Sequence, residues 1–366
     1  MSTSREFASD VLKPLNQLAV HSRFLENGMI TKNDISNNIW PGVSIILPIL
    51  NEERFLEKTI TAINEQNYPG KIEIILALGP SKDRTNEIAN SLAQIYSNLK
   101  LVVNPTGRTP NGLNLAISSS QYSIICRVDG HAEVKNNYLA LAVQTLLETG
   151  SVNVGGVMAA NGISKFEKSV AKAMRSKIGV GAARFHVGGK AGEVDTVYLG
   201  TFDKAALLAV GGYDENFTRA QDWELNFRLR KNGGKIFFNP NLEVTYRPRP
   251  NLTALSKQYF EYGKWRHVVV RTHKGSVNFR YLAPPTMFSI NLISIVISAW
   301  VPQLLIFPTL YLAALIITGL LIGRNIWEWV SLPVIFFVMH MSWGLGYLTS
   351  SPRLLGKTQK LLNHTS

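Results

Sequence analysis

The chain has 366 residues, a net charge of +13 and a single cysteine. This length allows one large domain or two medium ones, and a lone cysteine excludes an intrachain disulfide. A basic chain can bind nucleic acid, but most of the excess charge lies beside an apolar C-terminal region, so we expect no nucleic-acid partner. Residues 1–41 are mixed and polar without a signal-peptide pattern, and we interpret them as a lead-in.

The elements predicted after this lead-in alternate between strand and helix. Short apolar runs predict strands over 43–48, 71–78, 101–103 and just before Asp129. Apolar residues at helical spacing predict helices over 52–65, 83–96 and 110–118. This alternation is typical of a parallel α/β sheet, in which ligands bind beyond the carboxyl ends of the strands. We therefore expect a ligand site formed by residues 48–52, 79–85 and 129–131.

The segment Cys-Arg-Val-Asp-Gly-His-Ala-Glu-Val, residues 126–134, presents a carboxylate where a strand is predicted to end. Asp129 at this position, followed by a turn at Gly130, suits a divalent metal that also holds a diphosphate. Such sites often read Asp-x-Asp, whereas here the third residue is His131. Imidazole is an acceptable ligand for Mn²⁺. His131 therefore either ligates the metal, hydrogen-bonds a phosphate or a metal-bound water, or has a purely structural role.

The composition changes sharply after Pro284-Pro285. No charged residue occurs from Met287 to Ile322, and a further apolar run covers residues 326–348. One bilayer crossing takes roughly 20 apolar residues. Residues 286–350 therefore predict two or three transmembrane helices, divided near Pro302–Pro308.

Basic residues flank this apolar region on both sides. In the basic segment 251–285, Lys257, Lys264 and Arg271 are spaced by seven residues. On a helix this spacing places them on nearly one face. Such a face could lie on anionic lipid or attract a lipid diphosphate. A basic tail covers 351–366. Positive charge on both flanks favours the cytoplasmic side for the soluble domain and the tail, and hence an even number of crossings. We expect a multi-pass protein of the inner (cytoplasmic) membrane whose catalytic domain faces the cytoplasm.

Several motifs then occur in an order that is typical of one family. They are Val43-Ser-Ile-Ile-Leu-Pro-Ile-Leu-Asn-Glu52, Gly79-Pro-Ser-Lys-Asp-Arg-Thr85, Gly107-Arg108 with Leu113-Asn114, Val210-Gly-Gly-Tyr-Asp-Glu215, and Gln221-Asp-Trp-Glu-Leu225 with Arg228-Leu-Arg230. The set resembles a family 2 glycosyltransferase of the GT-A fold, a Rossmann-like nucleotide-diphospho-sugar transferase domain over residues 42–250. Asp-Gly-His with an apolar C-terminal region most resembles the subgroup that contains the succinoglycan-biosynthesis glucosyltransferases.

The resemblance also implies site residues. The nucleotide-sugar site would comprise Pro48, Asn51, Glu52, Ser81, Asp83, Arg108, Asn114 and Asp129. Asp129 and His131 would hold Mn²⁺ or Mg²⁺, and Asp222 would be the general base, with Trp223 and Glu224 on the acceptor side. Simpler interpretations stay open, because Asp222 and Asp83 could cap helices, Arg108 could be a solvated side chain and Trp223 could pack in the core.

Two departures from the family pattern bear on specificity. Gly79 stands where the family's loop acid usually contacts uracil, which puts the base contact in question. A Gln-x-x-Arg-Trp motif, the mark of processive polymer synthases in the family, is absent from the sequence. We therefore expect one sugar to be transferred to each acceptor.

These features predict a membrane-anchored inverting glycosyltransferase of cell-envelope or exopolysaccharide synthesis. It would transfer a hexose, glucose being the sugar that the subgroup suggests, from a UDP-sugar to a polyprenyl-diphosphate-linked saccharide. Two alternatives stay open. One is transfer to polyprenyl phosphate itself, and the other is a non-catalytic membrane scaffold with the GT-A fold, which the glycine at position 79 would favour.

Overall fold

The computed structural model describes residues 39–352, 354 and 355. Nearly all of the predicted lead-in, and most of the basic tail with Arg353, Lys357 and Lys360, lie outside the described residues.

Within this range the chain forms a nine-stranded sheet in the order β3-β2-β1-β4-β8-β6-β9-β5, with β7 beside β9. The strands are β1 (Val43–Ile49), β2 (Ile72–Leu78), β3 (Leu99–Val103), β4 (Ile124–Arg127), β5 (Glu133–Val134), β6 (Asn153–Ala160), β7 (Gly192–Glu193), β8 (Tyr198–Asp203) and β9 (Ile236–Tyr246). The first four are parallel, as predicted. However, β8 runs antiparallel to both β4 and β6, so the complete sheet is mixed.

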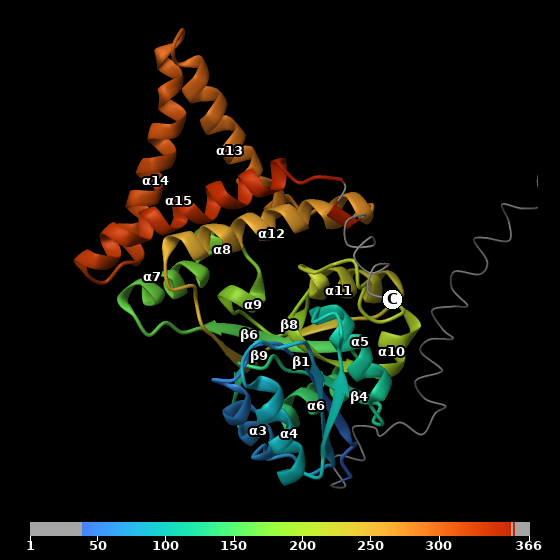
Figure 1. The fold of residues 1–366 in the computed structure, drawn as a ribbon. Helices are drawn as coiled ribbons and strands as arrows, with labels where there is room; N and C mark the ends of the chain where they lie inside the picture. The colour runs from blue at the N-terminus through green and yellow to red at the C-terminus, as the bar shows by residue number, and fades with distance from the viewer. Residues whose placement is uncertain (1–38, 353, 356–366) are drawn as a thin grey trace, which may run out of the picture.

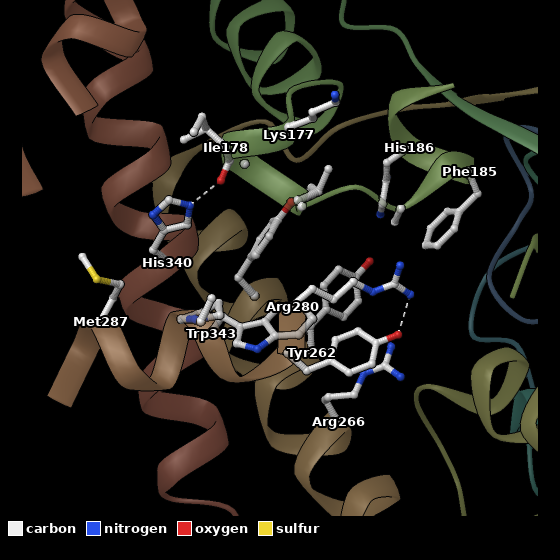
Figure 2. Close-up of a pocket in the computed structure, with 18 residues that line it drawn as sticks. Lys177, Ile178, Phe185, His186, Tyr262, Arg266, Arg280, Met287, His340 and Trp343 are labelled. Carbon is white, nitrogen blue, oxygen red and sulfur yellow. Dashed lines mark hydrogen bonds between the residues drawn. The ribbon is translucent and has the colours of Figure 1, made fainter. Parts of the chain in front are cut away.

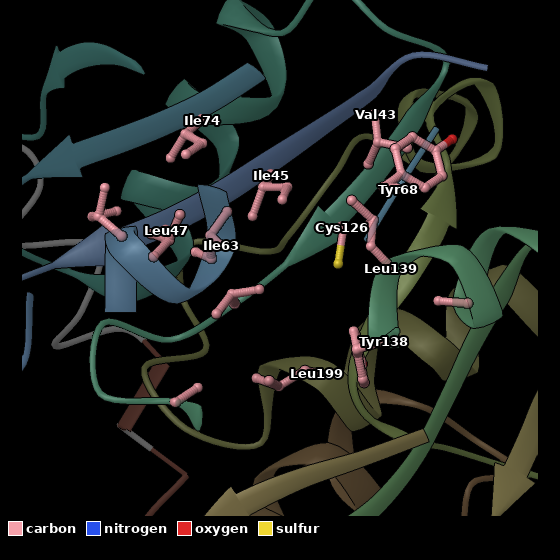
Figure 3. Close-up of a cluster of buried hydrophobic side chains, with 14 of the residues drawn as sticks. Val43, Ile45, Leu47, Ile63, Tyr68, Ile74, Cys126, Tyr138, Leu139 and Leu199 are labelled. Carbon is pink, nitrogen blue, oxygen red and sulfur yellow. The ribbon is translucent and has the colours of Figure 1, made fainter. Parts of the chain in front are cut away.

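Helices cover both faces of the sheet. They are α3 (Leu56–Asn64), α4 (Thr85–Ile95), α5 (Thr109–Ser119), α6 (Tyr138–Thr149), α7 (Lys165–Met174), α8 (Lys177–Val180), α9 (Arg184–Val187), α10 (Lys204–Ala209) and α11 (Gln221–Lys231). Successive β1 residues point to opposite faces. Ile45 and Leu47 pack in a core with α3 and α6, and Ile46 packs in a second core with α5 and α11 (Figure 3 shows the first). Burial on both faces explains why these strands are continuously apolar.

The C-terminal part is helical. It comprises α12 (Leu252–Thr272), α13 (Phe279–Ile297), the 3₁₀ helix η1 (Pro302–Leu305), α14 (Ile306–Ile322) and α15 (Ile326–Leu348). Figure 1 shows α13 and α14 as a hairpin that projects away from the sheet, whereas α15 returns alongside α12. The predicted division near Pro302 falls at the tip of this hairpin. Pro284 and Pro285 lie inside α13, so this helix begins earlier than the sequence predicted.

Two segments of the described chain, Pro302–Ile322 and Ile326–Leu348, are long and apolar enough to cross a bilayer. Only a minority of each apolar window is buried inside the structure, 17% and 33% respectively. The core helices of a soluble protein would be mostly buried. The exposure therefore favours contact with a membrane.

The helix α12 is covered by α15 along much of its length. A Cβ on Gly263 would lie 2.0 Å from the Trp343 carbonyl oxygen, and one on Gly346 would lie 2.0 Å from that of Phe260, so the two backbones touch where glycine allows it. Arg271 donates to the Ser350 carbonyl oxygen at 2.8 Å. Lys264 pairs with Glu261 at 3.0 Å, whereas Lys257 stays exposed. Of the three predicted lipid-facing cations, two therefore make contacts within the protein.

Candidate active site

Two loops at the carboxyl ends of β1 and β2 are joined by side chains that the sequence singled out. The Asn51 amide donates to Ser81 Oγ at 3.1 Å, and the Lys82 amide donates to Asn51 Oδ1 at 2.8 Å. Asn51 has a φ of 57°, a left-handed conformation that asparagine tolerates better than most residues. Asp83 Oδ1 accepts from the Thr85 amide at 3.1 Å. Asp83 thus supports the start of α4 from one residue before its N-cap, which is Arg84, so Asp83 is not itself the cap.

A pocket of about 210 Å³ lies beyond these strand ends. Its lining brings together four predicted site residues, which are Pro48, Glu52, Asp129 and His131. Arg108 and Asn114 are outside this lining. Arg108 is half-buried, and its Nη1 has no hydrogen-bond partner among the described residues. Asn114 donates to the Tyr213 carbonyl oxygen at 2.8 Å and to Glu215 at 3.0 Å, so it ties α5 to the loop before α11.

Glycines let the loops around this pocket approach one another closely. A Cβ on Gly79 would lie 3.0 Å from both the Gly107 Cα and a Leu50 methyl carbon. A Cβ on Gly130 would lie 2.7 Å from an Ile49 methyl carbon. An acid at position 79 would therefore require the neighbouring loop to move. Gly79, which stands where the family pattern has an acid, thus lets the neighbouring loops pack more closely than an acid would allow.

A buried arginine connects the two carboxylates that the sequence placed at the reaction centre. Arg127, at the end of β4, is 4% exposed. Its Nη2 donates to Asp129 Oδ1 at 3.0 Å, and its Nη1 donates to Asp222 Oδ1 on α11. Sequence reasoning gave Arg127 no role. The signal was its position two residues before Asp129, which in extended backbone places both side chains on one face.

Asp222 is not the N-cap of α11. The N-cap is Ala220, whose φ is 58°, and Asp222 lies within the first turn. The capping interpretation of Asp222 is therefore wrong. Burial raises the pKa of Asp222, the positive charge of Arg127 partly offsets this, and the negative charge of Asp129 raises it again, to a pKa of about 6. A carboxylate with this pKa is ionised at neutral pH yet is a stronger base than an exposed aspartate.

His131 contacts Glu52 as well as the pocket. Its Nδ1 lies 2.8 Å from Glu52 Oε1, and this hydrogen bond raises the pKa of His131. Groups of three His, Cys, Asp or Glu that could hold a metal ion are absent from the described residues. Mg²⁺ is commonly bound by one or two carboxylates together with substrate phosphates. Arg127 Nε and Nη2 both donate to Oδ1 of Asp129, so Oδ2 suits a metal that arrives with a diphosphate.

The two residues predicted on the acceptor side make internal contacts. Trp223 is 5% exposed, and its Nε1 donates to Tyr281 Oη at 2.8 Å. Glu224 is fully buried, accepts from Arg228 at 2.6 Å and lies 2.9 Å from His273. Both residues thus hold α11 against the helices that follow, which for Trp223 agrees with the core-packing interpretation.

Known proteins with similar sequences or folds identify the class. Residues 44–206 match glycosyl transferase family 2. The succinoglycan biosynthesis protein ExoA of Rhizobium meliloti is 32% identical over 66% of this chain and 73% of its own length. A dolichyl N-acetyl-alpha-D-glucosaminyl phosphate 3-beta-D-2,3-diacetamido-2,3-dideoxy-beta-D-glucuronosyltransferase of Methanococcus voltae is 28% identical over 83% of this chain and 95% of its own length.

A solved structure shows the same fold. The mannosyltransferase PcManGT of Pyrobaculum calidifontis, in complex with GDP-Man and Mn²⁺, has a TM-score of 0.53 at 18% identity and covers 91% of this chain and 96% of that one. The mixed sheet, with its pocket beyond the strand ends, is therefore the GT-A fold of a glycosyltransferase, as the sequence predicted. Within that class, the chain belongs to glycosyl transferase family 2.

Proposed function

We propose that this protein is a membrane-anchored inverting glycosyltransferase that transfers a hexose from a UDP-sugar to a polyprenyl-diphosphate-linked saccharide. The observation that carries the proposal is the Arg127 bridge, in which one buried guanidinium holds Asp129 at the pocket and Asp222 beside it. Relatives support the acceptor. ExoA is named for succinoglycan synthesis, and the Methanococcus voltae enzyme is named for a sugar acceptor linked to dolichyl phosphate.

In the proposed reaction, Asp222 removes the proton from an acceptor hydroxyl. The hydroxyl oxygen attacks the anomeric carbon, the bond from that carbon to the diphosphate oxygen breaks, and UDP leaves with the bonding electrons. Arg127 holds Oδ1 of Asp222, which orients Oδ2 for the proton. Because the attacking oxygen and the leaving diphosphate are on opposite faces of the sugar, the anomeric configuration inverts.

Asp129 and His131 are the residues that would hold a divalent metal. Such an ion supplies positive charge for the departing diphosphate. Arg127 is too buried and too engaged with two carboxylates to take over this role. The proposed donor site therefore needs a metal ion, which Asp129 Oδ2 and the diphosphate oxygens would hold together.

The pH dependence of transfer tests the assignment of the base. Asp222 must be ionised to accept a proton, so kcat/KM is expected to fall about tenfold per pH unit below a pH of about 6. The same raised pKa means that the folded state binds more protons than the unfolded state between pH about 4 and 6. The contribution of Asp222 to stability therefore decreases as the pH rises through that window.

Rates at saturating metal, measured alongside UDP binding over the same pH range, separate this effect from loss of the donor site. UDP binding is expected to change with pH through His131, whose pKa is also raised, and so to follow a different curve from the rate. If the fall in kcat/KM at low pH follows UDP binding, or persists when Asp222 is replaced, then a group other than Asp222 causes it.

The hairpin of α13 and α14 is the proposed membrane anchor. At 1.5 Å per residue, the 21 residues from Pro302 to Ile322, which include α14, span about 31 Å, close to the roughly 30 Å of a bilayer core. The chain then returns to the soluble domain, because Glu328 at the start of α15 pairs with Lys172 of α7 at 2.5 Å. Two crossings place the domain and the end of α15 on the same side, in line with the charge pattern.

In this proposal α15 lies in the plane of the membrane surface, although its composition would allow it to cross. It packs along α12, which carries Lys264, Arg266 and Arg271. If α15 crossed the bilayer, these charges would be carried into it at considerable cost.

Cysteine labelling tests this topology. Gln303→Cys at the hairpin tip and Arg324→Cys at its return are expected to react with a membrane-impermeant maleimide from opposite sides of sealed vesicles. The lone native Cys126 is buried and serves as the unlabelled background. Lys190→Cys on the soluble domain is expected to react on the same side as Arg324→Cys. Labelling of positions 303 and 324 from one side would show that the hairpin does not cross.

A further inference from the structure

A second cavity, of about 240 Å³, lies between the soluble domain and the C-terminal helices. Its walls come from α8, α9, α12, α13 and α15, and its residues are all different from those of the pocket beside Asp129 (Figure 2). Much of the wall is aromatic or aliphatic, including Phe185, Tyr262 and Met287. The proposed reaction gives none of these residues a role.

Unpaired polar atoms are concentrated in the wall of this cavity. Within the described part of the chain, five buried atoms of its lining have no hydrogen-bond partner, which are Arg266 Nε, Arg266 Nη1, Trp343 Nε1, Tyr259 Oη and His186 Nδ1. The arginine and tryptophan groups can only donate. Buried donors are rarely left unpaired in native proteins. Their convergence from three elements indicates that a group rich in acceptor oxygens binds between them.

The charge of the cavity favours an anion. The guanidinium of Arg266 lies 4.3 Å from the centre of the Trp223 ring and 4.0 Å from that of Tyr281, so aromatic rings rather than a carboxylate hold it in place. Arg280 adds a second guanidinium, which donates to Asp195 at 2.6 Å. The positive charges of Arg266 and Arg280 are therefore balanced by only one carboxylate among these contacts, that of Asp195.

Two histidines line the cavity, and the one on α9, His186, is neutral. Burial and the nearby charge of Arg280 lower the pKa of His186 to about 3. As a neutral imidazole, it can offer one N–H to an oxygen ligand. Figure 2 shows His186 facing the arginines from the opposite wall, whereas the amino group of Lys177 points away.

The position of the cavity matches a lipid-linked acceptor. Pro284 and Met287 in its wall belong to α13, whose next two turns expose apolar side chains, among them Leu292, Ile293 and Val296. On the other side, Trp223 contacts Arg266 and is the neighbour in sequence of Asp222. An anion held by Arg266 would thus lie between the apolar face of α13 and α11, the helix that carries Asp222.

We propose that this cavity binds the phosphate or diphosphate group of a prenyl lipid, with Arg266 and Trp343 as its main donors and the hydrocarbon chain along α13. The inference rests on the proposed function, because it names the site for the lipid end of that acceptor. Free phosphate or pyrophosphate shares the same oxygen chemistry and is the other possible source of the anion.

Binding of soluble probes to the full-length protein in detergent tests the proposal. Calorimetry would compare farnesyl diphosphate, inorganic pyrophosphate and farnesol. Farnesyl diphosphate is expected to bind at least about tenfold more tightly than either of the others, because only it offers both the anion and the chain. Arg266→Gln is expected to weaken its binding by about tenfold or more.

Trp343→Phe is the second variant, because it removes one N–H and keeps an aromatic ring. It is expected to weaken binding by about threefold to tenfold. The matched control is Arg175→Gln, which removes an exposed arginine outside the cavity and is expected to bind like the wild type. UDP binding is expected to be unchanged in all three variants, which also shows that they are folded.

The outcomes separate this site from the proposed function. Wild-type binding of farnesyl diphosphate by both Arg266→Gln and Trp343→Phe would overturn the site, even if the protein transfers sugar. Pyrophosphate binding as tight as that of farnesyl diphosphate would overturn the lipid assignment. Variant-sensitive binding of farnesyl diphosphate by a protein that transfers no sugar would uphold the site and refute the proposed function.

Discussion

Replacing Asp222 by Asn is expected to lower kcat for sugar transfer by about 10²–10⁴-fold while UDP still binds. The amide keeps the shape of the side chain and can still accept a hydrogen bond from Arg127, so the Arg127 bridge is expected to survive. What it loses is the capacity to take a proton from the acceptor. Steady-state rates with a UDP-sugar and a lipid-linked saccharide, together with UDP binding, measure both quantities.

Asp203→Asn is the matched control, because Asp203 lies outside the family motifs and accepts from the Ala206 amide as the N-cap of α10, a role that asparagine also fills. It is expected to retain nearly full activity. If Asp222→Asn also retains activity, no base is needed. A phosphate is already a nucleophile, so that result would favour polyprenyl phosphate as the acceptor.

Replacing Arg127 by Gln is expected to destabilise the folded protein by about 3–5 kcal/mol. The guanidinium is buried between Asp129 and Asp222, and its removal leaves two carboxylates without their cation. Denaturant or thermal unfolding in detergent measures the change. The loss is expected to be smaller at pH 5 than at pH 8, because protonation of Asp222 relieves the repulsion.

Arg127→Lys keeps the charge and is expected to lose less stability than Arg127→Gln. A loss for Arg127→Gln that is below 1 kcal/mol, or that does not depend on pH, would show that the bridge contributes little to the fold.

The sequence predicted the parallel half of the fold well because each of its strands is a local signal. The runs at 43–48 and 71–78 are apolar on both faces, and the helices between them show helical spacing. The second half depends on pairing between distant segments, such as β4 with β8, which no local pattern encodes. Glycine-containing strands like β6 also give a weak strand signal.

The site could be predicted only in part from the sequence, for a similar reason. The motifs placed Asp129 and Asp222, but their shared partner Arg127 becomes visible only when β4 and α11 come together. Hydropathy likewise marked residues 326–348 as apolar without showing that they pack on α12. The glycines at 263 and 346 permit that packing, yet only the folded chain shows that they meet the facing backbone.

Release of UDP from a panel of UDP-sugars would show whether the protein is a metal-dependent glycosyltransferase. The detergent-purified full chain would receive a lipid extract as acceptor source with Mn²⁺, Mg²⁺ or EDTA, as wild type and as Asp129→Ala. We expect metal-dependent release with one hexose donor and loss of that release in the variant. Wild-type release that continues in EDTA and in Asp129→Ala would contradict the proposed donor site. Folded protein that releases no UDP from any donor would contradict the proposed UDP-sugar donor and would leave either a missing acceptor or a scaffold, with the scaffold favoured.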